Sequence, residues 1–64
     1  MGLKLKLKRI EKGFKQGEFA EKVGISRYYL SALENGRATN PGIPVMKKIS
    51  EILETPVTEL FFED

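Results

Sequence analysis

The stretch from Gln16 to Arg37, QGEFAEKVGISRYYLSALENGR, constrains the fold of this chain more than any other segment. Apolar residues at helical spacing lie on both sides of Gly24, which suits a tight turn because glycine adopts a positive φ without steric cost. Ser26 is a good helix cap, since its hydroxyl can accept a backbone N–H. Asn35-Gly36 is a helix stop signal. The pattern predicts two short helices that meet at a tight turn.

The rest of the chain predicts three more short helices. Before this stretch, apolar residues recur at i, i+4, i+7 and i+11, as an apolar helical stripe made of Leu3, Leu7, Ile10 and Phe14. LKLKLK also alternates like a strand, but the pattern continues to Gly13, and this length favours a helix. After the stretch, Pro44 suits the first turn of a helix, and Thr55-Pro56 interrupts the chain before a last apolar segment. We therefore expect one all-α domain over 1–64, a compact bundle of five short helices at 3–13, 16–23, 26–35, 44–54 and 57–62.

Length and composition limit the classes of function. Sixty-four residues make one small domain, and such a chain buries only about 60% of its unfolded surface. The chain has no cysteine and no histidine, so disulfides and the usual zinc ligands other than carboxylates are missing. No apolar run approaches the roughly 18 residues that cross a bilayer. We expect a cytoplasmic protein with no metal, no cofactor, no membrane segment and no small-molecule ligand.

The charge distribution favours a polyanionic partner, and the types of residue present argue against catalysis. The net charge is +2, with Lys and Arg in excess over residues 1–40 and acidic residues in excess over residues 41–64. Such asymmetry suits a basic binding face with a separate acidic end, although small domains also carry it by chance. General acid–base chemistry draws on histidine or on carboxylates with a shifted pKa, and no histidine is present. The six glycines are scattered singly, so no phosphate-cradling loop is formed.

Three sequence elements together carry a family resemblance. The pattern QxxFAxxVGIS, followed by xLxxLENG and a loop that contains proline, resembles the helix-turn-helix domains of the Cro/C1-type (XRE-like) repressors. The resemblance extends from about Leu5 to Phe61. It implies a lambda-repressor-like fold in which the second and third helices form the helix-turn-helix, and the third helix enters the major groove of double-stranded DNA.

The resemblance also implies which residues contact the bases. These are Arg27, Tyr28 and Ala32, with Ser31 as a second-rank contact. A guanidinium can pair with guanine O6 and N7 through two hydrogen bonds, which makes Arg27 the strongest candidate. The alternative for Arg27 is a phosphate contact or a solvated charge. Ala32 either touches a thymine methyl or only permits close approach.

The resemblance further implies phosphate contacts and one structural ion pair. Phosphate contacts are expected from Gln16, Tyr29, Asn35, Arg37 and Thr39. Two of these have alternatives, because Tyr29 can pack against the second helix and Asn35 can serve as a helix terminator. In family members that carry them, the residues matching Arg9 and Glu34 form a largely buried ion pair between the first helix and the end of the third.

The first helix departs from the family pattern. Lys8 lies where relatives usually have an apolar residue, whereas its neighbour Leu7 is apolar. Either the helix is rotated, or Leu3 and Leu7 form an exposed patch.

These observations favour a sequence-specific transcriptional regulator, a repressor that binds a palindromic operator as a homodimer. The dimer interface is expected in the apolar tail, at Val57, Leu60, Phe61 and Phe62, although Leu60 and Phe61 can also complete the core. The alternative function is a protein-interaction module, antitoxin-like or anti-repressor, whose tail binds a protein partner.

Overall fold

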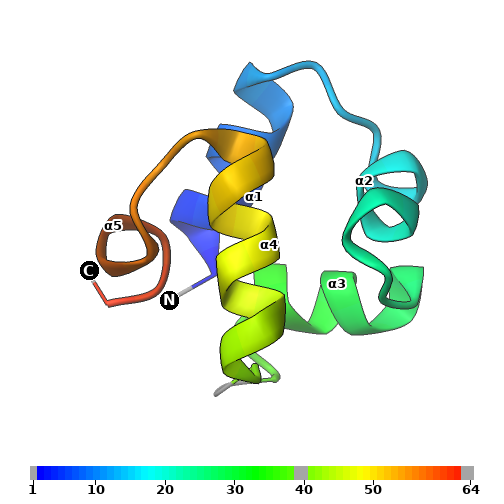
Figure 1. The fold of residues 1–64 in the computed structure, drawn as a ribbon. Coiled ribbons are helices and arrows are strands. Elements are labelled where there is room, and N and C mark those ends of the chain that lie inside the picture. The colour runs from blue at the N-terminus through cyan, green and yellow to red at the C-terminus, as the bar shows by residue number, and fades with distance from the viewer. Residues whose placement is uncertain (1, 39–40, 63–64) are drawn as a thin grey trace.

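The computed structural model describes residues 2–38 and 41–62, and every regular element within these ranges is an α-helix. The five helices are α1 (Leu3–Glu11), α2 (Gln16–Val23), α3 (Arg27–Glu34), α4 (Ile43–Leu53) and α5 (Val57–Phe61) (Figure 1). The predicted all-α bundle is confirmed. Each helix starts within one residue of its predicted start and ends within two residues of its predicted end.

The helix boundaries follow from local backbone chemistry. Gly24 adopts φ 88° at the end of α2, and the Ser26 hydroxyl accepts the Tyr29 N–H at 2.9 Å at the start of α3. Both expectations for the turn are therefore confirmed. Pro44 lies in the first turn of α4, where its missing N–H leaves no helical hydrogen bond unmade. The turn and its cap fix the angle at which α3 leaves α2.

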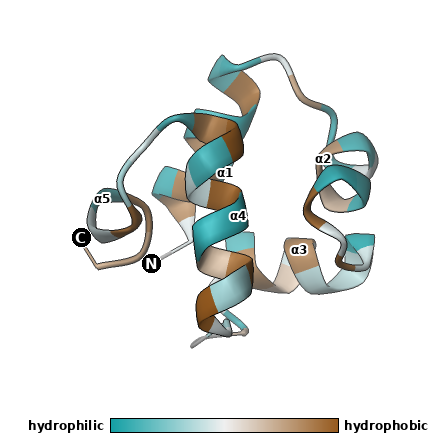
Figure 2. Ribbon diagram, viewed as in Figure 1, coloured by the Kyte–Doolittle hydropathy of each residue, from teal (hydrophilic) through white to brown (hydrophobic). Residues whose placement is uncertain are grey.

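One apolar core lies among the five helices. α2 and α3 pack against each other, and α5 packs against both α1 and α4. In Figure 1, α5 lies on one side of α4, and the α2–α3 pair lies on the other. Figure 2 shows hydrophobic and hydrophilic bands alternating along α4, as expected for a helix with one face on the core. The buried core residues are Leu5, Phe19, Ala20, Leu30, Leu33, Ile49, Leu53, Leu60 and Phe61.

Helix α1 exposes its apolar stripe and buries another face. Leu5 and Arg9 are buried, whereas the side chains of Leu3, Leu7 and Ile10 are 62%, 53% and 54% exposed. The alternative that Leu3 and Leu7 form an exposed patch is therefore confirmed, and Ile10 extends that patch. The physical reason is that α1 directs the guanidinium of Arg9 toward α3, and a spacing argument counts arginine as a surface residue.

The apolar tail divides between the core and the surface. Leu60 and Phe61 are buried in the core, and Val57 is partly buried against it. Phe62 is 67% exposed. Of the four predicted interface residues, Phe62 therefore offers the largest free apolar surface, and Leu60 and Phe61 stabilise the monomer.

Gly2 is packed against the end of α3, and this contact leads to a prediction for stability. A Cβ at this position would overlap the backbone carbonyl groups of Leu33 and Glu34. We expect Gly2→Ala to lower the free energy of unfolding by about 1–3 kcal/mol, because overpacking forces the backbone to shift. Urea denaturation followed by circular dichroism measures the change. Gly42→Ala is the matched control, since its Cβ would meet only the Pro44 Cδ at 3.6 Å. Equal stability of the two variants would contradict the predicted close approach.

A surface ion pair joins the end of α1 to the end of α4. The Lys12 ammonium donates to the Glu54 carboxylate at 2.8 Å, and this hydrogen bond, followed by the lysine charge, lowers the pKa of Glu54. A lowered pKa in the folded state means that the pair adds stability above the pKa of the unfolded chain, and this contribution is lost as the pH falls through the folded pKa. We expect Lys12→Met to raise the Glu54 pKa, measured by NMR titration of its side-chain carboxyl carbon. An unchanged pKa would show that the pair does not persist in solution.

Candidate nucleic-acid interface

One face of α3, continued by Asn35 after its end, presents polar and aromatic side chains to solvent. Arg27, Tyr28, Ser31 and Asn35 fall within an arc of about 100° on the helix, given 3.6 residues per turn. Arg27, Tyr28 and Asn35 are exposed, Tyr28 at 78%, and Ser31 is partly exposed. Opposite this arc, Leu30 and Leu33 are buried in the core. The helix therefore combines an apolar anchor with an exposed face rich in hydrogen-bond donors.

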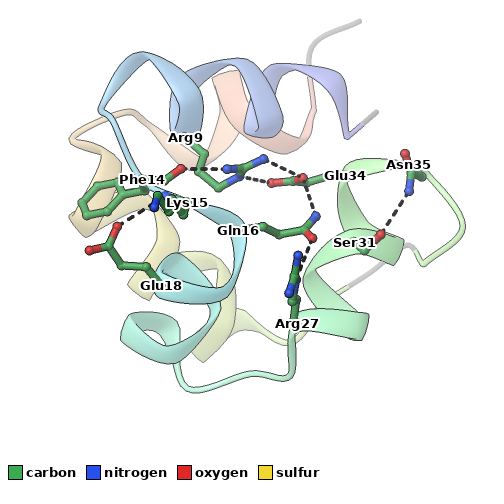
Figure 3. Close-up of polar contacts among 9 residues, drawn as sticks. All are labelled: Arg9, Phe14, Lys15, Gln16, Glu18, Arg27, Ser31, Glu34 and Asn35. Atoms are coloured by element: carbon green, nitrogen blue, oxygen red, sulfur yellow. Dashed lines mark hydrogen bonds and ion pairs between the residues drawn. The ribbon is translucent and has the colours of Figure 1, made fainter.

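A chain of hydrogen bonds runs from the interior to this face (Figure 3). The Arg9 guanidinium donates to both carboxylate oxygens of Glu34, from Nε at 2.6 Å and from Nη2 at 3.3 Å. The Gln16 amide donates to Glu34 Oε1 at 3.1 Å. The Gln16 carbonyl oxygen accepts from Arg27 Nε at 3.3 Å. A buried ion pair is thus connected through one amide to an exposed arginine.

The predicted ion pair of Arg9 and Glu34 is present and is satisfied on both sides. Both residues are buried, and Arg9 Nη1 donates to the Phe14 carbonyl at 2.7 Å. Within residues 2–38 and 41–62, every buried side-chain nitrogen and oxygen has a hydrogen-bond partner. Together these contacts join α1, the α1–α2 loop and the end of α3, and so they help to hold the helix-turn-helix on the rest of the bundle.

Gln16 has a positioning role that the sequence analysis missed. Its amide group is oriented by contacts at both ends, because only the carbonyl oxygen can accept from Arg27 and only the NH2 can donate to Glu34. Gln16 is only partly exposed. The 18 residues that separate Gln16 from Glu34 leave no local pattern from which this contact could have been predicted.

The other predicted site residues differ in how accessible they are. Arg37 is exposed, and Asn35 donates from its amide to the Ser31 hydroxyl at 3.3 Å. Tyr29 is partly buried against the core, in agreement with its packing alternative. Ala32 is only 6% exposed, so its methyl group has little surface to offer a base. We therefore leave Ala32 out of the interface. Thr39 lies outside the described residues.

The exposed face is suited to binding an anion. Arg27, Arg37 and Lys15 are exposed donors near the helix-turn-helix, and such donors bind phosphate oxygens.

Over the described ranges, no three His, Cys, Asp or Glu side chains gather where they could hold a metal ion. No helix in the same ranges has the length and apolar character needed to cross a membrane.

Comparisons of sequence identify the family and several relatives. The family model described as helix-turn-helix matches residues 5–60. The HTH-type transcriptional regulator SinR of Bacillus subtilis is 40% identical over 63 residues, which are 98% of this chain and 57% of SinR. The HTH-type transcriptional regulator YqaF of the same organism is 47% identical over 60 residues, 94% of this chain and 76% of YqaF. The chain thus spans little more than half the length of SinR.

Comparison of structures leads to the same family. The crystal structure of SinR in complex with DNA matches with a TM-score of 0.86 and 39% identity, over 95% of this chain and all of that chain. The fold is therefore shared with a protein whose structure has been solved in complex with DNA. The chain belongs to the Cro/C1-type helix-turn-helix family of DNA-binding transcriptional regulators.

Proposed function

We propose that this chain binds double-stranded DNA in a sequence-specific manner and regulates transcription, with α3 inserted in the major groove. The observation that carries the proposal is the exposed first turn of α3, where Arg27 is held by Gln16 at the helix-turn-helix junction. A fixed arginine at the start of such a helix can donate to the edge of a guanine. SinR, which shares this fold, has been solved with DNA.

The proposed contacts divide into two groups by chemistry. Arg27 and Tyr28 contact bases, with Ser31 behind them, because these are the groups that α3 exposes in its first two turns. Phosphates are bound by Arg37, Asn35 and the Tyr29 hydroxyl, together with Thr39 and the remaining N–H of Gln16. Phosphate contacts fix the register of the helix on the duplex and leave the choice of sequence to the base contacts.

We further propose that the protein acts in the cytoplasm as a homodimeric repressor on a palindromic operator. One module of this size contacts few base pairs, and two copies related by a two-fold axis double the sequence that is recognised. Phe62 is the candidate centre of the dimer interface, since it is the exposed aromatic residue at the end of α5.

Selection from a random duplex library, followed by titration of the enriched site at several salt concentrations, tests the function. The expected result is an enriched palindrome whose half-sites lie about one helical turn apart. Salt-sensitive binding with no enriched sequence would overturn the proposal of specific readout, because phosphate contacts alone produce that behaviour. A single enriched half-site would keep the readout but contradict the dimer.

Replacing Phe62 tests the dimer interface. We expect Phe62→Glu to raise the dimer dissociation constant by about tenfold or more, since a charge must then be buried in an apolar contact. Analytical ultracentrifugation measures the constant, and circular dichroism checks the fold. Ile43→Glu is the matched control, because Ile43 is also 67% exposed but begins α4. An unchanged dimer in Phe62→Glu, or equal weakening in the control, would exclude Phe62 from the interface.

A further inference from the structure

Helix α1 carries an apolar stripe on its solvent side. Leu3, Leu7 and Ile10 are spaced i, i+4 and i+7, so they form one line along the helix, and each is more than half exposed. Single exposed apolar residues are ordinary on a protein surface. Three in line on one helix match the spacing of anchor residues where helices pack side by side. We call these three residues the α1 stripe.

The α1 stripe is bordered by positive charges. If Leu3 and Ile10 are placed at heptad position d and Leu7 at position a, then Lys4 falls at e and Lys6 at g, the positions that flank a helix–helix seam. Neither lysine forms an ion pair with another residue in the described ranges. Glu11, at the next e position, is already contacted by the Lys8 ammonium at 3.5 Å. The charges left available beside the stripe are therefore basic.

We propose that the α1 stripe binds an amphipathic helix of another protein, one with an apolar seam and acidic residues along both edges. Charges at e and g decide which helices pair, since opposite charges across the seam attract and like charges repel. A Leu or Ile seam would pack on the stripe, and Glu at the flanking positions would face Lys4 and Lys6.

A second copy of this chain fits the stripe less well. In a parallel pair of α1 helices, Lys6 of each copy could face Glu11 of the other, but Lys4 would gain no acidic partner. Three side chains on a helix of nine residues bury far less than the roughly 1,200 Å² that a stable protein interface needs, so either occupant would bind weakly, and the charges decide between them. An acidic helix satisfies both lysines and can bind weakly and reversibly.

The proposed partner leaves the DNA-binding face accessible. Arg9 points from α1 toward Glu34 and the helix-turn-helix, as Figure 3 shows. In heptad terms Arg9 is at position c and Leu5 at f, on the opposite side of α1 from the stripe. The inference goes beyond DNA binding and does not depend on it, because none of the stripe residues belongs to α2 or α3.

Two synthetic helical peptides distinguish the proposed specific binding from nonspecific apolar binding. Both carry the same Leu/Ile seam, one with Glu and the other with Lys at every flanking position. Each is titrated into the isotope-labelled protein and followed by amide NMR shifts. We expect saturable shifts along α1 with the Glu peptide, and at least about tenfold weaker binding of the Lys peptide. Leu7→Lys should abolish the shifts, whereas Ile43→Lys, a change at an exposed apolar residue on α4, should leave them unchanged.

Three outcomes would overturn the proposal. Equal binding of the two peptides would show apolar binding in which the flanking charges do not select the partner. Saturable shifts that lie outside α1, or that persist in Leu7→Lys, would place the binding elsewhere. Concentration-dependent α1 shifts in the protein alone, lost in Leu7→Lys, would identify a second copy as the occupant. The unfolding midpoint of Leu7→Lys, measured in parallel, confirms that the variant is folded, as expected for a residue 53% exposed.

Discussion

Arg9→Ala is expected to destabilise the fold by about 3–5 kcal/mol, the usual cost of removing one partner from a buried ion pair. The carboxylate of Glu34 would stay buried with only the Gln16 amide as a side-chain donor. Total stability for a chain of this length is only about 3–10 kcal/mol. A large fraction of the variant should therefore be unfolded at 37 °C. Urea denaturation at 25 °C, followed by circular dichroism, measures the loss.

Two comparisons separate the charge effect from simple truncation. Lys6→Ala removes an exposed cation from the same helix and should change stability by less than about 0.5 kcal/mol. The double variant Arg9→Met/Glu34→Leu should recover much of the stability lost in Arg9→Ala, because a well-packed apolar pair often replaces a buried ion pair without loss. Full stability of Arg9→Ala combined with loss of DNA specificity would instead make Arg9 part of the binding site.

Arg27→Ala is expected to relax the choice of base at one position in each half-site of the selected operator. The loss of a paired contact to guanine is worth about 1–3 kcal/mol, or about 5- to 150-fold in affinity for the preferred duplex. Duplexes that already carry another base at that position should bind the variant and the parent chain almost equally. Competition titrations with single-base operator variants measure this difference.

Arg37→Ala is the matched comparison, since Arg37 is an exposed arginine beyond the end of α3. If Arg37 contacts a phosphate, Arg37→Ala should weaken binding to all duplexes to a similar extent. It should also lower the slope of log K against log salt concentration by about 1. If Arg27→Ala behaves in this way as well, Arg27 contacts phosphate and not a base. Gln16→Ala should reproduce part of the Arg27 effect, because it removes the acceptor of the Arg27 Nε hydrogen.

The five helices could be predicted because their ends depend on local chemistry. Gly24, Ser26 and Pro44 act on neighbouring backbone groups, and the structure places each of them as expected. Hydrophobic spacing alone does not predict the orientation of α1, although the family resemblance implied the buried pair of Arg9 and Glu34. Its buried face includes Arg9, whose partner Glu34 lies 25 residues away. Hydrophobic spacing gives no weight to a buried arginine, so it selected Leu3, Leu7 and Ile10 in its place.

The candidate site was only partly predictable for a similar reason. Arg27, Tyr28 and Arg37, which the resemblance implies as DNA contacts, are exposed. The burial of Ala32 depends on how α3 and the chain after it pack, which spacing along α3 does not reveal. The link from Glu34 through Gln16 to Arg27 joins the start of α2 to both ends of α3. Such contacts exist only once α2 and α3 have packed together.

The hydrogen bond between Gln16 and Arg27 also limits the direction from which a base can be approached. An arginine presents two edges to a planar acceptor, one made of Nε and an Nη group and one made of the two Nη groups. Gln16 occupies the only hydrogen of Nε. The side-on edge is therefore closed, and a guanine must meet the guanidinium end-on. While this bond is kept, the base lies along the long axis of the side chain, which sets how deep in the groove Arg27 can make its contact.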